Sequence, residues 1–251
     1  MNYKAEYLDN TNFLNEFDIK LLNSYKLPFK RVKENKKLLE HQEFEFVYIS
    51  AKTEGNTYTK AEAITLLEKG LTAGGKPFYD AKMLQNIKNA FDEFVLNPKE
   101  VSKEVIKDIH FVLNEGILEK QKLGIFRDEA VLIKGANYIP PVKREFINSE
   151  IDYLLSQVNK IKEPFNKAIY LHNNLAYIQP FIDGNKRTAR IIQAMVLSYY
   201  DIMPLISKES YISLYLDSLI EYYETGKYDK YITYFKSAYE EQYHFLKQVL
   251  N

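Results

Sequence analysis

The chain has 251 residues, which is long enough for one large domain or for a core with appended helices. Lysine plus arginine and aspartate plus glutamate number 34 each, so the formal net charge is zero and the overall positive charge of a dedicated nucleic-acid binder is absent. The chain contains no cysteine, which excludes disulfides, thiolate zinc sites and a cysteine nucleophile.

The sequence carries no readable targeting or membrane-spanning segment. The N-terminal stretch MNYKAEYLDNTNFLNEF lacks the apolar region of a signal peptide, and no run of about 18 apolar residues occurs. We therefore expect a cytoplasmic protein that binds neither nucleic acid nor a membrane. The absence of cysteine suits that compartment.

Most of the chain shows the spacing of amphipathic helices. The first predicted helix covers residues 36–55 and ends at Gly55, a favourable C-terminal residue. A capping box formed by Thr59 and Glu62 predicts the start of the second helix. Further helices are predicted over 80–96, 102–116, 142–161, 163–178, 185–200, 208–224 and 229–249. The sequence thus predicts an all-α fold.

Residues 127–141, RDEAVLIKGANYIPP, break the helical pattern. The apolar run Val131, Leu132 and Ile133 precedes a turn that contains glycine, and Tyr138 begins a second short run. Two β-like runs around such a turn predict a small hairpin, which must rest on the helices or be mobile. An exposed strand edge there could pair with an extended peptide.

The stretch AYIQPFIDGNKRTAR, residues 176–190, has the features of an anion site. A helix that starts near Asn185 offers free backbone N–H groups, and Gly184 permits close approach. Arg187 and Arg190 are one turn apart and can face the same ligand. A carboxylate beside phosphates usually needs a divalent metal between them, so Asp183 predicts magnesium. Taken singly, such a turn is often only a helix cap.

Three separated motifs together resemble the Fic (Fido) family. The family signature is His-Pro-Phe-x-Asp/Glu-Gly-Asn-Gly/Lys-Arg-x-x-Arg, and residues 180–190 match it, whereas Gln179 stands at the histidine position. Residues 127–141 are similar to the family's flap, and SAKTEGN at 50–56 is similar to its inhibitory motif, Ser/Thr-x-x-x-Glu-Gly/Asn. The resemblance covers roughly residues 38–240.

The resemblance implies a Fic helical bundle with a small β-hairpin flap and the activity of a protein adenylyltransferase. Such an enzyme transfers AMP from ATP to a tyrosine, serine or threonine hydroxyl of a target protein, and homodimers are common among relatives. Its residue roles would be magnesium on Asp183; phosphates on Gly184, Asn185, Lys186, Arg187 and Arg190; inhibition by Ser50 and Glu54; and target binding by Val131, Leu132, Ile133 and Tyr138. In relatives with this motif, the inhibitory glutamate pairs with the second arginine, here Arg190.

The resemblance also implies three regions. Residues 1–79 would be an N-terminal helical region with the inhibitory helix at about 38–55. Residues 80–205 would be the Fic core, with the flap at about 127–141 and the motif at 179–190. Residues 206–251 would be C-terminal helices packed on that core.

Gln179 puts the chemistry in question, because an amide cannot accept the hydroxyl proton at neutral pH as imidazole does. His172 lies about 10 Å before it along a helix axis and falls on an apolar face, so we expect a core histidine. Three functions follow: a self-inhibited adenylyltransferase that is inactive or nearly so, a nucleotide-binding or antitoxin-like pseudoenzyme, and a Doc-like kinase. Pro180, Gly184 and the inhibitory motif disfavour the third.

Overall fold

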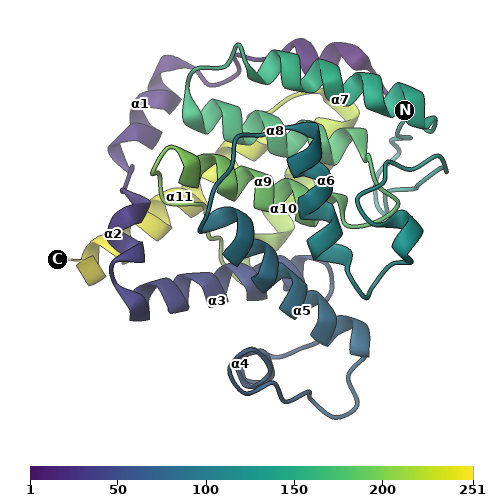
Figure 1. The fold of residues 1–251 in the computed structure, drawn as a ribbon. Coiled ribbons are helices and arrows are strands. Elements are labelled where there is room, and N and C mark those ends of the chain that lie inside the picture. The colour runs from purple at the N-terminus through teal and green to yellow at the C-terminus, as the bar shows by residue number, and fades with distance from the viewer. Residues whose placement is uncertain (251) are drawn as a thin grey trace.

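Helices form nearly all the regular structure of the computed structural model, which describes residues 1–250 (Figure 1). The α-helices in this range are α1 (Glu16–Ser24), α2 (Phe29–Lys33), α3 (Lys36–Thr53), α4 (Lys60–Lys69), α5 (Phe78–Ala90), α6 (Lys103–Asn114), α7 (Arg144–Val158), α8 (Pro164–Ile178), α9 (Asn185–Tyr199), α10 (Ile212–Thr225) and α11 (Asp229–Leu250). A π-helix, Phe91–Val95, continues α5, and short 3-10 helices cover Ala5–Asp9, Lys120–Lys122 and Glu209–Tyr211. The predicted all-α fold is therefore confirmed.

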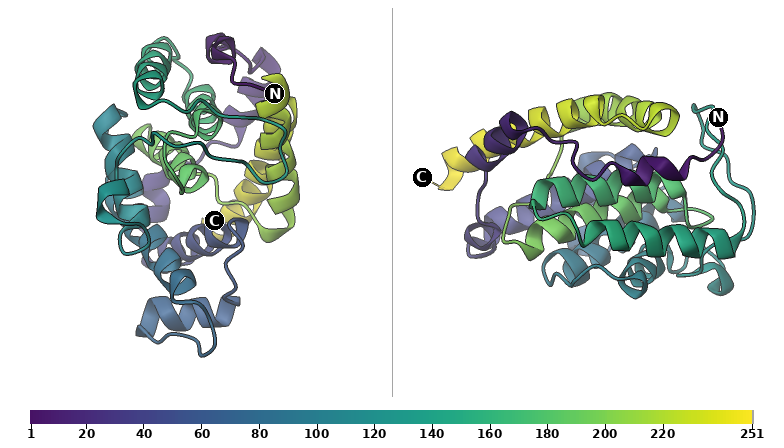
Figure 2. Two further views of the ribbon diagram at one scale, coloured as in Figure 1. Left: turned by 90° about the vertical axis from the view of Figure 1, so that its right-hand side faces the viewer. Right: turned by 90° about the horizontal axis from the view of Figure 1, so that it is seen from above.

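The antiparallel pair α8 and α9 forms the centre of the molecule, and the other long helices surround it (Figures 1 and 2). Both helices are buried almost all round, and residues 168–178 of α8 are all buried. The neighbouring helices therefore enclose the polar side chains of α8 and α9 together with the apolar ones. α6 packs on α9, while α7 and α10 pack on α8, so the loop from α8 to α9 is held by a buried scaffold.

The helix predicted at 36–55 is α3, which packs along α5. Its N-terminus is capped by the Asn35 side chain, which accepts a hydrogen bond from the Leu38 N–H at 3.2 Å. The capping box predicted for the next helix is present, with Thr59 and Glu62 bonded to each other's backbone. Beyond α3, helix α4 and the loop that follows it project from the body of the protein (Figure 1).

The β-hairpin predicted at 127–141 is absent, because residues 1–250 contain no strand and only two isolated bridges. The segment is an extended loop, and the hydrogen-bonding groups of its second arm are used elsewhere. The Ile139 N–H donates to the Met1 carbonyl at 2.7 Å, and the Asn137 N–H donates to Glu224 Oε1 at 3.3 Å. The N-terminal segment therefore takes the place of a partner strand, as Figure 2 shows beside the loop.

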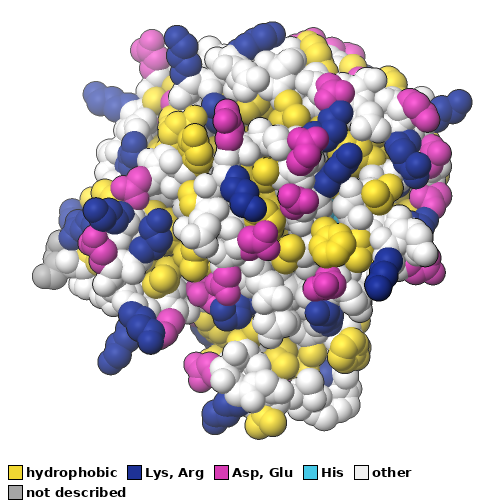
Figure 3. Space-filling model, in the orientation of Figure 1, with side chains coloured by type: hydrophobic (Ala, Val, Ile, Leu, Met, Phe, Trp, Pro, Cys, Tyr) yellow, Lys and Arg dark blue, Asp and Glu magenta, His cyan; other side chains and the backbone are white. Residues whose placement is uncertain are grey.

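One hydrophobic core extends through all three predicted regions. It includes Phe46 and Leu66 before residue 80, the central helices, and Tyr222 and Phe235 after residue 206. Within residues 1–250, no helix is long and apolar enough to cross a bilayer. Lysine, arginine, aspartate and glutamate side chains alternate over the face that Figure 3 shows, without a large area of one sign.

Candidate active site

The loop from α8 to α9 is stiffened by the Asn185 amide. Its Oδ1 accepts from the Phe181 N–H at 2.8 Å, and its Nδ2 donates to the Phe181 carbonyl at 2.8 Å and to Gln179 Oε1 at 2.9 Å. The Asn185 side chain is thus occupied by the loop. A ligand could therefore be bound through the backbone N–H of Asn185 and not through its amide.

Arg127 holds the same loop from the side of the flap. Its buried guanidinium donates from Nε to the Gln179 carbonyl at 2.7 Å, and its backbone N–H donates to the Pro180 carbonyl at 3.0 Å. Hydrogen bonds from a charged donor are among the stronger ones in proteins. The arginine thereby joins the start of the flap segment to the end of α8.

His110 of α6 packs against the same loop. Its ring stacks on Phe181 with the ring centroids 3.8 Å apart. Nδ1 accepts the Gly124 N–H at 3.0 Å, so Nε2 carries the proton and donates to the Asp183 carbonyl at 3.1 Å. Burial lowers the pKa of His110 to about 4, and the ring is neutral at physiological pH.

The N-terminus of α9 is open to an anion. Gly184 precedes the helix in the left-handed conformation, with φ at 76°, and no side chain caps the first turn. Asn114 lies directly against this glycine, since a Cβ atom added to Gly184 would be 2.6 Å from Asn114 Nδ2. Glycine is required here both for the backbone conformation and for space. The helix dipole and the free N–H groups favour a negative group at this point.

Arg187 has two donors without a partner. The side chain is 1% exposed, and NH2 donates to Asp183 Oδ2 at 3.0 Å. Its Nε and NH1 atoms are buried and make no hydrogen bond to any part of the described chain. Leaving buried polar atoms unpaired costs about 1–3 kcal/mol each, so the site is built to receive an acceptor. A phosphate oxygen is such an acceptor.

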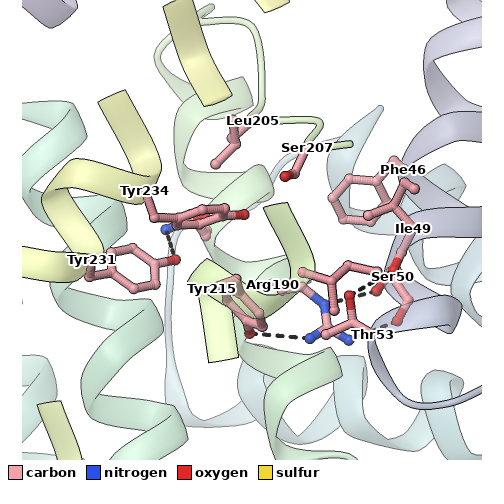
Figure 4. A pocket seen from close by; sticks show the side chains of 12 residues that line it. Phe46, Ile49, Ser50, Thr53, Arg190, Leu205, Ser207, Tyr215, Tyr231 and Tyr234 are labelled. Atoms are coloured by element: carbon pink, nitrogen blue, oxygen red, sulfur yellow. Dashed lines mark hydrogen bonds between the residues drawn. The ribbon is translucent and has the colours of Figure 1, made fainter. Parts of the chain in front are cut away.

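Arg190, the second arginine of the motif, is already occupied. Its NH2 donates to Glu54 Oε1 at 2.7 Å, and its Nε donates to Ser50 Oγ at 2.9 Å. On the other side, NH1 donates to the Tyr215 hydroxyl at 3.2 Å (Figure 4). The contact expected between Glu54 and Arg190 is therefore present. Lys186 adds a second cation, with Nζ 3.4 Å from Glu54 Oε2.

The Glu54 carboxylate lies in a strongly positive setting. Burial by itself raises its pKa, but Arg190, Lys186 and Arg187 together outweigh burial and lower the pKa to about 2. Glu54 is consequently ionised throughout the physiological range of pH. Its carboxylate occupies the position between these three cations that an anionic ligand would occupy.

The Gln179 side chain is not basic, and both ends of its amide are already hydrogen-bonded. Its Nε2 donates to the Ala176 carbonyl at 2.6 Å, and its Oε1 accepts from Asn185. The residue is 8% exposed and adopts the left-handed conformation, with φ at 51°. Both ends of the amide therefore serve to close α8 and brace the loop.

His172 is not available to the site as a base. The residue is completely buried in α8, and its Nε2 lies 3.2 Å from the Tyr215 hydroxyl. Burial, followed by the charge of Arg190, lowers the pKa of His172 well below its ordinary value. The prediction of a core histidine is confirmed.

Asp183 is the one motif carboxylate, and its side chain is half exposed. Within residues 1–250, no group of three or more His, Cys, Asp or Glu side chains could hold a metal by itself. Magnesium bound with a nucleotide commonly uses one or two carboxylates, the phosphates and several waters. The single Asp183 beside the unpaired Arg187 donors fits that kind of site.

The flap residues divide into an exposed and a buried set. Leu132 is 86% exposed, whereas Tyr138 is 1% exposed and its hydroxyl donates to the Tyr177 carbonyl at 2.8 Å. Val131 and Ile133 are half-buried. Tyr138 therefore anchors the loop to α8, whereas the arm around Leu132 is exposed.

Sequence reasoning missed the residues that support the motif from other helices. Asn114 and His110 lie on α6, and Tyr215 lies on α10, far from the motif along the chain. No local pattern marks them, because each contact depends on how the helices pack. Arg127 was noted only as part of the flap pattern.

Comparison with known proteins shows what the region of this site is similar to. Residues 100–197, which contain α6, the flap, α8 and most of α9, match the model of the Fic/DOC family. This part of the chain resembles the Fic/DOC family. The chain is also similar to proteins named protein adenylyltransferase Fic, at 26% identity over 178 residues in Nematostella vectensis and 28% over 177 residues in Drosophila willistoni. These alignments cover 68% of this chain but only 41% and 35% of the two relatives.

Solved structures show the same fold. Fic-1 from C. elegans, residues 134–508, superposes with a TM-score of 0.73 at 21% identity, covering 91% of this chain and 70% of that one. A Fic family protein from Desulfovibrio desulfuricans G20 gives a TM-score of 0.73 at 16% identity, covering 97% and 74%. A third, IbpAFic2-H3717A, was solved in complex with adenylylated Cdc42 and gives a TM-score of 0.57 at 13% identity, covering 95% and 76%.

Proposed function

We propose that this protein is a Fic-type protein adenylyltransferase that binds ATP with magnesium, is inhibited by its own Glu54, and is inactive or nearly so in AMP transfer because Gln179 replaces the general base. The observation that carries the proposal is the position of the Glu54 carboxylate between Arg190 and Lys186. An internal anion occupies a cradle whose remaining donors on Arg187 are unpaired.

Each part of the site has a role in this proposal. The first N–H groups of α9 and the Arg187 donors would bind phosphate oxygens, and Asp183 would hold magnesium. Arg190 would bind the outer phosphates, which requires Glu54 to leave it first. The exposed arm of residues 131–133 would receive an extended segment of the target.

AMP transfer forms a bond between the target hydroxyl oxygen and the α-phosphorus of ATP, while the bond to the β-phosphate oxygen breaks and pyrophosphate leaves. The hydroxyl proton needs an acceptor at the position of Gln179. The Gln179 amide is not basic and is already bonded to Ala176 and Asn185. Loss of a general base typically reduces a rate by about 10²–10⁴-fold.

The same Gln179 contacts favour a second candidate function. Because this amide braces the loop, the residue suits a protein that keeps the nucleotide pocket without catalysing transfer. Such a protein would be a nucleotide-binding or antitoxin-like regulator of a partner. A Doc-like kinase is the third and least favoured alternative.

The deciding experiment compares four forms of the chain: unchanged, Glu54→Gly, Gln179→His and the double variant. Each is incubated with magnesium and ATP labelled at the α-phosphate, alone and with a cell lysate. The adenylyltransferase proposal expects the double variant to label itself or a lysate protein most strongly. Adding Arg187→Ala to the double variant is the control, and it should abolish the labelling.

Binding of ATP by calorimetry separates the remaining outcomes. If the double variant binds ATP but labels nothing, the regulator is favoured and the adenylyltransferase loses its main support. Label from the γ-phosphate in place of the α-phosphate would favour the kinase. A Glu54→Gly variant that binds no ATP would count against every function that uses a nucleotide and would leave only the antitoxin-like regulator.

A further inference from the structure

A second cavity lies outside the motif, between α3, the segment 206–211 and α11. Its volume is about 450 Å³, and none of residues 179–190 lines it. Small-molecule sites in proteins usually have volumes of about 300–1,000 Å³. The groove is thus large enough for a ligand of one or two rings.

The walls of this groove are largely apolar. Tyr48 and Ile49 come from α3, Ile206 comes from the segment before α10, and Ala238 and Phe245 come from α11. The first four are buried, and Phe245 is 37% exposed at the edge. Flat aromatic and aliphatic surfaces of this kind favour a planar, apolar ring.

Gln42 gives the groove a specific polar group. The residue is 4% exposed, and it lines the groove, yet its carboxamide makes no hydrogen bond within residues 1–250. Gln242 lines the same groove and is fully bonded, with Nε2 donating to the Pro204 carbonyl at 2.8 Å and Oε1 accepting the Ile206 N–H at 3.0 Å. The hydrogen-bonding groups of the Gln42 amide thus have no partner in the described chain and reach the open groove, where a ligand with a complementary edge could bind them.

The charges around the groove argue against an anionic ligand. Lys60 pairs with Glu45, and Lys208 pairs with Glu241, while Glu209 remains as an additional carboxylate. Three carboxylates against two ammonium groups leave one excess negative charge. A phosphate or carboxylate ligand would meet no lysine or arginine of the lining that is not already paired.

We propose that this groove is a binding site for a small uncharged molecule with a planar ring and an amide edge. The ring would lie against Tyr48 and Phe245. The amide would form two hydrogen bonds with Gln42, one donated and one accepted, because a carboxamide carries both kinds of group.

A ligand in this groove would also brace α3. Ile49 lines both the groove and a smaller cavity of about 40 Å³ beside Arg190, and the next residue, Ser50, is bonded to Arg190 (Figure 4). Holding α3 in place would favour the arrangement in which Glu54 occupies Arg190, and ATP would bind less tightly. This consequence rests on the proposed function, whereas binding to the groove does not.

The test is a titration of the whole chain with nicotinamide, in which binding is measured from the NMR signals of Ile49 and Ala238. Nicotinic acid is the isosteric anionic probe. We expect saturable shifts with nicotinamide and at least about tenfold weaker binding of nicotinic acid. Gln42→Leu should weaken nicotinamide at least about tenfold, and Ala238→Phe should abolish binding by filling the groove. The matched control, Gln85→Leu on α5, should bind like the unchanged chain.

Shifts that do not saturate, or binding that survives Ala238→Phe, would overturn the site. If Gln42→Leu does not fold, Ala238→Phe decides alone. For the regulatory consequence, saturating nicotinamide should raise the Kd for magnesium-ATP in the unchanged chain and leave it unaltered in Glu54→Gly. An unaltered Kd in both forms, with groove binding intact, would overturn the bracing and leave the site standing.

Discussion

At the scale of single residues, Glu54 occupies the cations that would bind a phosphate group in the proposed function. Its carboxylate contacts Arg190 and Lys186, and it is charged at every physiological pH. A carboxylate and a guanidinium can pair with defined orientation as well as charge. The pair therefore fixes where α3 ends relative to α9, and it closes the proposed phosphate site at the same time.

Removing this charge should strengthen nucleotide binding. We expect Glu54→Gln, which keeps the shape of the side chain, to lower the Kd for magnesium-ATP about tenfold or more, as measured by calorimetry. A tenfold change corresponds to about 1.4 kcal/mol, a modest part of a charge-assisted pair. Glu40→Gln, an exposed change on the same helix, should have no effect. Equal affinities in Glu54→Gln and the unchanged chain would contradict the inhibitory role.

The Glu54 pair should also contribute pH-dependent stability. The pKa of Glu54 in the folded chain is about 2, below its ordinary value of 4.5. Its stabilisation is therefore complete above about pH 4.5 and is lost as the pH falls through 2. We expect the difference in unfolding free energy between the unchanged chain and Glu54→Gln to shrink by roughly half from pH 6 to pH 3. Urea unfolding at both pH values measures it, and a difference that stays constant would refute the charge pair.

At the scale of elements, the N-terminus of α9 depends on close contact between two helices. Gly184 fits only because it has no side chain where Asn114 of α6 lies. The backbone N–H groups of the first turn can then face a ligand while the loop stays buried beneath them. Sequence and packing agree at this position, since the glycine also satisfies the left-handed backbone.

Gly184→Ala should therefore be more harmful than an alanine at another left-handed glycine. Gly70 ends α4 with φ at 69° and has nothing within 4 Å of an added Cβ. Gly70→Ala should lose about 1–2 kcal/mol for the backbone alone. Gly184→Ala should lose about 1–3 kcal/mol more, because Asn114 must move, and it should weaken ATP binding. Chemical denaturation measures the unfolding free energy of both variants, and calorimetry measures their ATP binding. Equal losses of unfolding free energy would show that the Asn114 side chain moves aside at no cost.

At the scale of the whole molecule, the Fic/DOC region is not a separate folding unit. Residues 100–197 include the buried helices α8 and α9, but α10 and α11 cover part of them, and α3 lies over Arg190. The hydrophobic core continues from one region into the next without interruption. Cooperative unfolding of the chain as one unit is the physical consequence.

A fragment limited to residues 100–197 should consequently fail to fold. Calorimetry of the whole chain should show one transition whose calorimetric and van't Hoff enthalpies agree. The fragment should show no transition and no dispersed amide signals in its NMR spectrum. A fragment that unfolds cooperatively would mean that the outer helices are dispensable for this core.

The sequence by itself determined the helices and the motif. Period 3.6 patterns and capping residues such as Thr59 are local, and so is the order of residues from Pro180 to Arg190, which a single loop and helix must contain. The fold class could therefore be predicted from local patterns, whereas the long-range contact between Glu54 and Arg190 was expected only from the resemblance to the Fic family. The small helices α1 and α2 had no comparably strong local signal, and they were expected only as part of an N-terminal helical region.

Only the tertiary structure decided the conformation of the flap and which side-chain hydrogen-bond donors have no partner. Residues 131–139 have the local pattern of a hairpin, but the Ile139 N–H is bonded to Met1 and Tyr138 is buried on α8, so the two arms do not pair. The unpaired donors of Arg187 and the free amide of Gln42 were likewise invisible in the sequence. The spacing of apolar residues shows which face of a helix is buried. The hydrogen bonds of a side chain depend on partners that only the packed helices bring within reach.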